Sequence, residues 1–203
     1  RKDDKLKAVF KCIGNEVEVV PDSLLEKFTL SYEDLNRDSF NMARLSKILR
    51  ERKDISFCRL PFCHTVEAES FGSKVVFDHK YGNRIGEYAI DSLDSLDELM
   101  DFDLSRGRIS EVLKAVQILK GEGERVFLEV TGPFTIGTSI ISSESFFKAI
   151  RRDKERLLDL LKIIEDSVID YILMGVRQGV DIISFADPAG TIDIVGPRIY
   201  RDL

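Results

Sequence analysis

The residues of this chain that could carry chemistry follow three short apolar segments, each just past the carboxyl end of its segment. They are Cys63, His64 and Glu67 after 55–60, Thr131 and Gly132 after 126–130, and Asp187 after 180–185. Thiols, imidazoles, carboxylates and exposed backbone N–H groups bind ligands, transfer protons or orient polar substrates. If the fold gathers the three places, they form the wall of one pocket.

The spacing of cysteine and histidine gives one candidate metal cluster. Cys58, Cys63 and His64 are arranged as Cys-x4-Cys-His, whereas a zinc site needs three or four ligands that converge tetrahedrally. Cys58 falls inside an apolar segment and is expected to be a small buried hydrophobe, so we predict no metal site here. For Cys63 and His64 two roles stay open. They either line a pocket or pack in the structure.

Each remaining candidate has a structural alternative. Glu67 and Glu69 are two residues apart on a predicted helical turn, so they do not share a face and do not form a carboxylate pair. Glu67 is either an acid in the pocket or a residue that caps a helix or forms a surface ion pair. The turn 131–133 either serves backbone geometry alone or offers N–H groups to an anion such as a sulfonate or phosphate. Asp187 either orients polar groups of a substrate or forms an Asx turn before Pro188.

The periodicity of apolar residues predicts helices that alternate with short strands. Strands are expected at 55–60, 74–78, 126–130 and 180–185. Helices are expected at 5–13, 39–53 (capped by Ser39), 67–71, 92–100, 109–120, from Ser143 or Ser145, at 153–178, and from Gly196-Pro197. Connecting segments are expected at 14–38, 79–91, 131–135 and 186–190.

This alternation predicts an α/β fold with parallel strands joined by right-handed crossovers. A closed barrel of this type needs eight strands, and the sequence offers only three that could lie in a core. We therefore predict a partial (β/α)8 TIM barrel, its N-terminal half, over 55–203, preceded by an N-terminal helical extension over 1–54. Parallel order places three segments at one edge of the sheet, and these are 61–67, 131–137 and 186–190.

Composition argues against two classes of partner. The 203 residues are 43% hydrophobic and 33% charged, which is typical of a globular domain. A net charge of −6 argues against nucleic acid as a partner, because phosphate binding requires a positive surface. No apolar stretch approaches the roughly 20 residues that cross a bilayer, and no signal segment opens the chain, so we expect no membrane partner and a cytoplasmic location.

Three motifs resemble the uroporphyrinogen decarboxylase superfamily, in the order that this family has them and each at the carboxyl end of a predicted strand. They are Leu60-Pro-Phe-Cys-His-Thr-Val-Glu-Ala-Glu-Ser-Phe-Gly72, Thr131-Gly-Pro-Phe-Thr-Ile-Gly137, and Asp181-Ile-Ile-Ser-Phe-Ala-Asp-Pro-Ala-Gly190 with Gly196-Pro197. The resemblance covers 55–203 well and 1–54 loosely. It implies either decarboxylation of uroporphyrinogen without a cofactor or zinc-dependent methyl transfer from a methylated corrinoid to a thiol such as coenzyme M.

The matched positions favour the methyltransferase branch. The decarboxylases carry an N-terminal Arg-x-x-Gly-Arg motif that clamps substrate carboxylates, and nothing before Leu60 matches it. Where they have a pyrrole-binding aspartate, a pocket tyrosine and a pocket serine, this chain has Cys63, Ser139 and Asp187. Segments similar to the methylcobamide:thiol methyltransferases are Val66-Glu-Ala-Glu69, Gly132-Pro-Phe-Thr135 and Ser184-Phe-Ala-Asp187.

This resemblance implies a set of site residues, a cofactor and partners. Asp187 is expected to be catalytic by orienting polar groups of the substrate, and the expected substrate-binding residues are Cys63, His64, Glu67, Thr131, Gly132, Ser139 and Ser184. The branch uses zinc, held by a His-x-Cys pair and a later cysteine, to lower the pKa of the thiol. No His-x-Cys occurs here, so we expect the zinc ligands to lie outside this chain and the chain to be incomplete for the reaction. The expected partners are methylcobamide or a corrinoid protein, and a small thiol.

Two alternatives stay open. One is a uroporphyrinogen decarboxylase that acts in porphyrin and heme biosynthesis. The other is a non-catalytic half-barrel that pairs with itself or with a second half-barrel to cover its open sheet edge.

Overall fold

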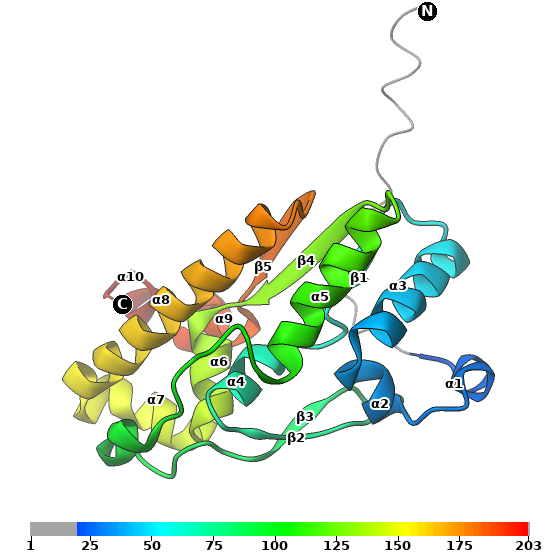
Figure 1. Cartoon of the computed structure of the whole chain (residues 1–203). Helices are drawn as coiled ribbons and strands as arrows, with labels where there is room; N and C mark the ends of the chain where they lie inside the picture. Colours follow the sequence, from blue (N-terminus) through cyan, green and yellow to red (C-terminus); the bar gives the residue numbers. More distant parts are fainter. Residues whose placement is uncertain (1–19, 203) are drawn as a thin grey trace, which may run out of the picture.

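The computed structural model describes residues 20–202, so the helix expected at 5–13 lies outside the described part of the chain (Figure 1). The strands are β1 (Cys58–Leu60), β2 (Lys74–Val76), β3 (Arg84–Glu87), β4 (Val126–Thr131) and β5 (Ile182–Ala186). The α-helices are α1 (Asp22–Phe28), α2 (Tyr32–Arg37), α3 (Ser39–Lys53), α4 (Val66–Ser70), α5 (Gly107–Gly121), α6 (Pro133–Ile140), α7 (Ser143–Arg152), α8 (Lys154–Arg177), α9 (Ile192–Val195) and α10 (Pro197–Asp202). Two 3-10 helices are η1 (Leu93–Glu98) and η2 (Pro188–Gly190). No described helix is both long and apolar enough to cross a membrane.

The core of the fold is a three-stranded parallel sheet in the order β1-β4-β5. In its register Leu60 lies opposite Leu128, and Leu128 lies opposite Ile183. The strands β2 and β3 form a separate antiparallel pair. The predicted α/β fold with parallel core strands is therefore confirmed.

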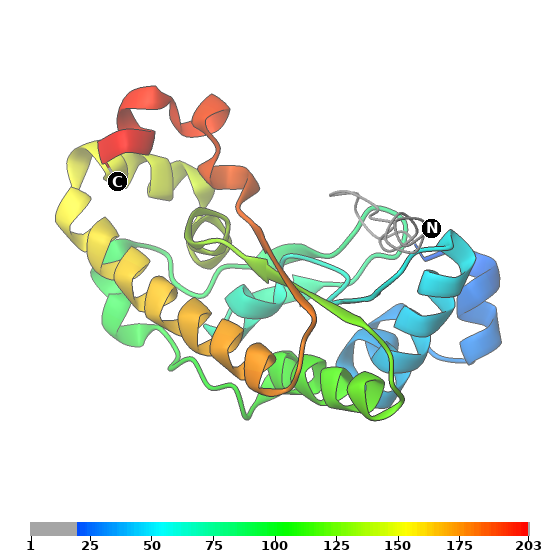
Figure 2. The same cartoon turned by 90° about the horizontal axis from the view of Figure 1, so that it is seen from above.

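The two faces of the sheet differ in what covers them. The helices α3, α5 and α8 lie in an arc along one face (Figure 2). On that face Val126, Leu128 and Val130 of β4 are fully buried, and Leu128 packs against Gly175 of α8. Because side chains alternate along a strand, the intervening residues of β4, among them Glu129, point to the opposite face.

The segment 14–38 was expected to be a connection, and this is wrong for α1 and α2. Helix α2 begins with a capping box, in which the Ser31 side chain accepts from the Asp34 N–H and the Asp34 side chain accepts from the Ser31 N–H. Leu24 and Leu35 are fully buried. Both helices are too short to be stable alone, so tertiary burial rather than local periodicity stabilises them.

The cap of α3 is a second correction. Asp38, not Ser39, is the capping residue, because its side chain accepts a hydrogen bond of 2.8 Å from the Asn41 N–H. Ser39 is the first helical residue, and its N–H donates to Glu111 of α5. Aspartate and serine cap helices about equally well, so sequence alone could not decide between neighbours.

Three further expectations are wrong in their extent. The segment 79–91 contains strand β3, whose exposed residues gave little alternation to read. The expected loop 131–135 is already helical from Pro133, because proline suits the first position of α6. The helix expected at 92–100 is the 3-10 helix η1.

Candidate functional site

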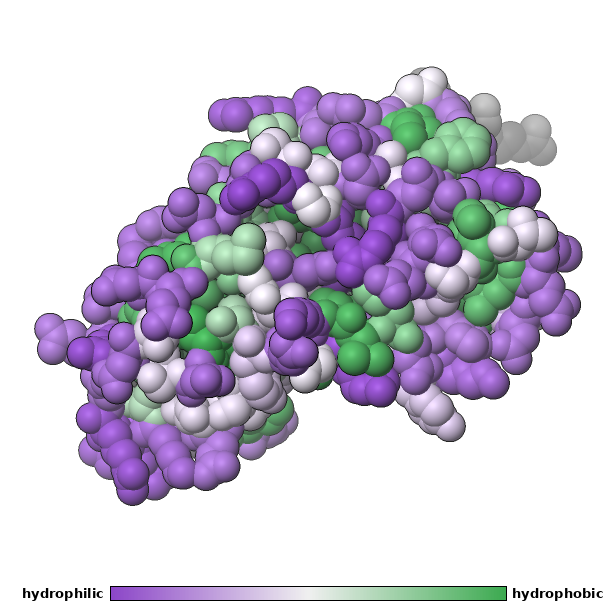
Figure 3. All heavy atoms as spheres, turned by 60° about the horizontal axis from the view of Figure 1, so that its bottom comes forward, coloured by the Kyte–Doolittle hydropathy of each residue, from purple (hydrophilic) through white to green (hydrophobic). Residues whose placement is uncertain are grey.

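The loops that follow β1, β4 and β5 meet at the carboxyl edge of the sheet, as expected for parallel strands. The Thr131 N–H donates to Glu67 of α4, and the Gly132 N–H donates to the Ala186 carbonyl at the end of β5. Figure 3 brings this end of the molecule forward and shows hydrophilic residues over much of it, with apolar patches between them. The segments 61–67, 131–137 and 186–190 are thus tied into one rim.

Glu67 is a fully buried carboxyl group that holds the end of β4. Its Oε1 accepts from the Thr131 N–H at 2.8 Å, and its Oε2 accepts from the Thr131 hydroxyl at 2.9 Å. Burial raises the pKa of Glu67, and the hydrogen bonds from Thr131 oppose this shift only in part. The arrangement joins the loop after β1 to the loop after β4.

The free energy of unfolding of the unmodified chain should fall as the pH rises, and we expect a smaller fall in the Glu67→Gln variant. Since the pKa of Glu67 is raised on folding, the stabilisation present below the ordinary pKa of 4.5 is lost as the pH rises through the raised value. A glutamine keeps both hydrogen bonds, because its oxygen accepts from the Thr131 N–H and its amide donates to the Thr131 hydroxyl. Urea unfolding across the pH range should show a smaller decline for Glu67→Gln than for the unmodified chain. The exposed Glu155→Gln is the control, and a decline as steep in Glu67→Gln as in that control would contradict the prediction.

Asp187 caps the amino end of α6 from the loop after β5. Its Oδ1 accepts from the Thr135 N–H at 2.8 Å and the Thr135 hydroxyl at 2.7 Å, and its Oδ2 accepts from the Phe134 N–H at 3.1 Å. Gly132 allows this approach, because a Cβ there would lie 2.6 Å from Asp187 Oδ2. A side-chain carboxylate thus satisfies the N–H groups and the positive dipole of the helix end.

This cap corrects one interpretation of the turn. The N–H groups of Thr131, Gly132, Phe134 and Thr135 all donate to acceptors within the protein, and Pro133 has no N–H. The turn therefore offers no N–H group to an external anion. Its role in backbone geometry, the other alternative, accounts for these contacts.

Asp187→Ala is expected to lower the free energy of unfolding by about 2 kcal/mol, the upper value for loss of a helix cap. Asp187→Asn should cost less, because its remaining oxygen still accepts from the Thr135 N–H. Urea denaturation measures both, with the exposed Asp170→Ala of α8 as the control. A chain as stable with Asp187→Ala as with Asp170→Ala would show that the cap contributes nothing.

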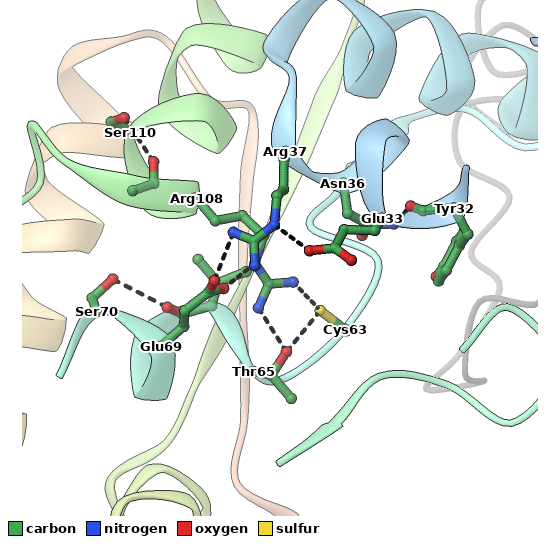
Figure 4. A network of polar contacts seen from close by, with 12 residues as sticks. Tyr32, Glu33, Asn36, Arg37, Cys63, Thr65, Glu69, Ser70, Arg108 and Ser110 are labelled. Atoms are coloured by element: carbon green, nitrogen blue, oxygen red, sulfur yellow. Dashed lines mark hydrogen bonds and ion pairs between the residues drawn. The ribbon is translucent and has the colours of Figure 1, made fainter. Parts of the chain in front are cut away.

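Cys63 is held by a charged network behind the loop after β1 (Figure 4). Arg108 of α5 donates to Cys63 Sγ at 3.1 Å, to the Thr65 hydroxyl at 2.8 Å and to Glu69 at 2.5 Å. Arg37 of α2 also donates to Glu69, at 2.9 Å. Burial by itself would lower the pKa of Arg108, but the Cys63 sulfur and the Glu69 carboxylate reverse this and raise it. The Cys63 thiol therefore serves as an acceptor for a buried cation.

His64 lies on the other side of the same loop, next to the face of the sheet that α3, α5 and α8 leave uncovered. Its Nε2 is 3.1 Å from Oε1 of Glu129, and Oε2 of Glu129 forms an ion pair with Arg59 of β1. The His64 side chain is 33% exposed, whereas those of Arg59 and Glu129 are 9% and 5% exposed. His64 is therefore the member of this group that solvent reaches.

The two predicted serines have different surroundings. The Ser139 hydroxyl donates to the Thr135 carbonyl within α6, and its own carbonyl accepts from Ser73. Ser184 of β5 is half-buried and lies opposite Glu129 in the sheet register. Ser139 thus supports the helix, whereas Ser184 shares a face with Glu129.

A cavity of about 580 Å³ opens between α6, α8 and the segment after β5. Of the eight predicted site residues, all of which lie in the described range, Asp187 lines this cavity and the others do not. Phe134, Leu158 and Leu161 give it an apolar wall, and the ion pair of Lys162 and Glu165 adds one charge of each sign. The predicted residues therefore do not line one cavity. Asp187 lies at this cavity, His64 and Ser184 lie at the sheet face that carries Glu129, and the others take part in the hydrogen bonds described above.

No metal site is evident within residues 20–202. No three His, Cys, Asp or Glu side chains converge there as a metal ion would require. Cys58 is buried, and burial raises its pKa to about 11, which disfavours the thiolate that binds zinc. The donors of this part of the chain do not fit the zinc that the family resemblance implies.

Three residues of the site were not expected from the sequence, and these are Arg59, Arg108 and Glu129. Arg59 and Glu129 each interrupt an apolar strand, and a charge at an inward position of a strand is a signal that could have identified them. Arg108 is the second residue of the amphipathic helix α5. Its polar side chain is of the same kind as those on the surface of this helix, so its type gives no sign of burial. Only the structure shows that it is buried.

The chain is similar to known proteins over most of its length. A family model described as Uroporphyrinogen decarboxylase (URO-D) matches residues 17–203. The protein described as Methylcobamide:CoM methyltransferase MtbA from Methanosarcina mazei is 28% identical over 174 residues, which are 84% of this chain and 51% of that protein. Methylcobamide:CoM methyltransferase MtaA from Methanosarcina barkeri is 27% identical over 185 residues, 88% of this chain and 54% of that protein.

A solved structure shows the same fold. A methyltransferase from Methanosarcina mazei superposes with a TM-score of 0.78 at 24% identity, over 93% of this chain and 59% of that one. The predicted partial TIM barrel is therefore confirmed, while the division at residues 54 and 55 stays a prediction. This chain spans about half the length of the curated relatives it matches. Since the family model covers nearly all of the chain, the chain belongs to the uroporphyrinogen decarboxylase (URO-D) family.

Proposed function

We propose that this protein takes part in methyl transfer from a methylcobamide to a small thiol such as coenzyme M. The observation that carries the proposal is the match to two proteins named methylcobamide:CoM methyltransferases over more than four fifths of the chain. The shared rim of the three loops supports it, since barrel enzymes bind substrates at the carboxyl ends of their strands. The donor is methylcobamide, free or on a corrinoid protein.

The site residues divide into two roles in this proposal. His64 and Ser184, on the sheet face that carries Glu129, are the residues that touch substrate. Positioning residues act through hydrogen bonds within the protein, and these are Cys63, Glu67, Thr131, Gly132, Ser139 and Asp187. The catalytic role expected of Asp187 becomes the placement of α6, because both of its oxygens are used for the helix cap.

Thiol activation by zinc requires ligands that residues 20–202 do not bring together. We therefore place the metal that this branch uses outside the described residues. The residues described here bind and position the substrate, and no proton or methyl step is assigned to them.

The test is an assay of the polypeptide that carries these residues with methylcobalamin, coenzyme M and Zn²⁺. Methylated coenzyme M, identified by mass spectrometry, is the expected product. Uroporphyrinogen without added metal is the parallel reaction, and its conversion to coproporphyrinogen would replace this proposal with the decarboxylase. If neither reaction occurs, both the methyltransferase and the decarboxylase functions are contradicted.

One surface favours a second function, as an interaction module. Phe185 of β5 is 56% exposed, and Ile169, Leu173 and Val176 form an exposed apolar stripe on α8. We propose that this face binds a second copy of the chain or a second half-barrel, since exposed apolar patches and open strand edges mark interaction sites. Light scattering of the chain alone measures self-association, and a monomer at all concentrations would exclude the second copy.

A further inference from the structure

We propose that a groove between α7 and the segment 195–199 binds the phosphate group of a small-molecule ligand through Arg151 and Arg198. The phosphate site goes beyond the proposed function and stands on the lining and the charges of the groove. Within the proposed function the phosphate is the phosphodiester that a cobamide carries in its nucleotide loop, and this identification alone rests on that function.

The groove lies beside the cavity that contains Asp187. It has a volume of about 520 Å³, and α7, the start of α8 and the segment 195–199 line it. Helix α7 follows β4 through α6, and the segment 195–199 follows β5. Val195 lines both this groove and the cavity of about 580 Å³ at Asp187. A ligand at the rim can therefore extend into the groove.

The lining of the groove is positively charged. It contains Arg151, Lys154 and Arg198 and no aspartate or glutamate. Arg151 and Arg198 are exposed, and the side chain of neither forms a hydrogen bond or an ion pair with another residue of 20–202. Lys154 has an interaction of its own, so only the two arginines are assigned to the site. Two arginines on one groove repel each other, and an anion that binds both removes this repulsion.

The surroundings of the groove do not neutralise it. An adjoining groove of about 620 Å³ shares Arg151 and adds Arg152, which also lacks an ion pair with any residue of the described range. The only carboxylate in that second lining is Glu144, and it pairs with Lys148. The positive charge of the arginines is therefore available to a ligand.

Helix electrostatics account for only one of the two arginines. Arg151 lies in the last turn of α7, where a cation interacts favourably with the helix dipole. Arg198 is the second residue of α10, where the dipole disfavours a cation. Since α10 has only six residues this effect is small, but it does not favour an arginine there. A bound anion supplies the partner that Arg198 lacks.

A glycine turn places Arg198 at the groove. Gly196, from the third sequence motif, has φ +80° and ψ 154°, a conformation that is almost exclusive to glycine. A Cβ there would meet nothing within 4 Å, so the backbone conformation rather than a lack of space requires glycine. Pro197 then fixes the φ angle of the next residue. The Gly-Pro pair thereby determines where α10 begins and where Arg198 lies.

The chemistry of the donors favours phosphate over a carboxylate. A guanidinium group binds phosphate oxygens with two parallel hydrogen bonds. The tetrahedral oxygens of a phosphate can face donors from two helices, whereas the oxygens of a carboxylate lie in one plane. The volume of the groove also leaves room for an organic group attached to the phosphate.

The first experiment titrates this chain into inorganic phosphate at low ionic strength and follows the phosphate by ³¹P NMR. The signal should broaden in a saturable manner, and added sodium chloride should weaken the binding, as expected for exposed charges. Acetate at equal ionic strength should not displace the phosphate. Displacement by acetate as effective as by unlabelled phosphate would overturn the preference for phosphate.

Three variants locate the site. Arg151→Gln and Arg198→Gln should each weaken binding roughly tenfold, the lower value for a hydrogen bond to a charged group, because both side chains are exposed. The matched control is Arg52→Gln, which removes an exposed, unpaired arginine from the last turn of α3. Helix α3 is remote from α7 in both views, so this variant should bind normally (Figures 1 and 2). Circular dichroism verifies that each variant is folded.

A second experiment identifies the source of the phosphate. Cyanocobalamin carries the nucleotide loop with its phosphodiester, whereas dicyanocobinamide lacks both. In equilibrium dialysis cyanocobalamin should bind roughly tenfold more tightly, and Arg198→Gln should remove the difference. Equal binding of the two corrinoids would contradict the cobamide as the source and leave the phosphate site to another ligand.

The outcomes separate the site from the proposed function. No saturable binding of phosphate, or equal binding by the unmodified chain and both arginine variants, would overturn the site. Inorganic phosphate neither donates nor accepts a methyl group, so its binding does not depend on methyl transfer. Phosphate binding without methyl transfer to coenzyme M would leave the site and contradict the methyltransferase. Methyl transfer without phosphate binding would do the reverse.

Discussion

Arg108→Met is expected to lower the free energy of unfolding by roughly 3 kcal/mol, because it removes one partner from a buried ion pair. The Arg108 side chain is only 1% exposed, and its donors reach Glu69, Cys63 and Thr65. Its loss leaves Glu69 with Arg37 alone and leaves the Cys63 and Thr65 side chains with only each other as hydrogen-bond partners. Urea unfolding followed by circular dichroism gives the free energy.

The matched control is Arg106→Met, two residues earlier in the chain. Arg106 is 60% exposed and pairs with Asp103 at the surface, so this change should leave stability unaltered. Arg108→Lys should fall between the two, since a lysine keeps the charge but not the planar set of donors. The double variant Glu69→Met with Arg108→Met should cost less than the two single changes added together. Equal stability of Arg108→Met and Arg106→Met would show that the buried pair is unimportant.

Gly132→Ala should lower the free energy of unfolding by about 3 kcal/mol, the upper range for overpacking a well-packed site. The new methyl group would lie 2.6 Å from Asp187 Oδ2, and that carboxylate cannot withdraw without releasing the amino end of α6. The change therefore separates the loop after β4 from the loop after β5. Thermal and urea unfolding both measure the loss.

Gly121→Ala is the control for that change. Gly121 ends α5, and a Cβ there meets nothing within 4 Å, so alanine should be neutral or slightly stabilising through its helix propensity. Combining Gly132→Ala with Asp187→Gly should recover part of the loss, because the second change removes the atoms that the methyl group meets. A double variant whose loss equals the sum of the single losses would contradict the proposed clash.

These contacts have a common consequence for the rim. The pair of Glu67 and Thr131 joins the loops after β1 and β4, and the pair of Asp187 and Thr135 joins the loops after β4 and β5. In each pair a carboxylate side chain accepts hydrogen bonds from backbone N–H groups. Such bonds hold one geometry more firmly than contacts between side chains alone. A pocket wall built from three loops is thereby pre-organised before any ligand binds.

Local periodicity was a good guide to the core elements. The strands at 126–130 and 180–185 and the helix at 153–178 are found as β4, β5 and α8, with ends that differ by no more than two residues. The apolar repeat is strong in these segments because one face of each packs in the core. It failed for α1 and α2, which are too short to show a repeat and are stabilised by tertiary burial, and for β3, which has no buried residue.

The sequence by itself determined the alternation of strands and helices, the parallel order of the core strands and the three loops that carry polar residues. These properties follow from the spacing of apolar residues along each helix or strand, which is visible in the sequence. Only the tertiary structure decided what each polar residue does. Glu67 and Thr131 are 64 residues apart, and Cys63 and Arg108 are 45 apart. Their partners come from different strands and helices, and the pattern within one element holds no information about which atoms of another element will face it.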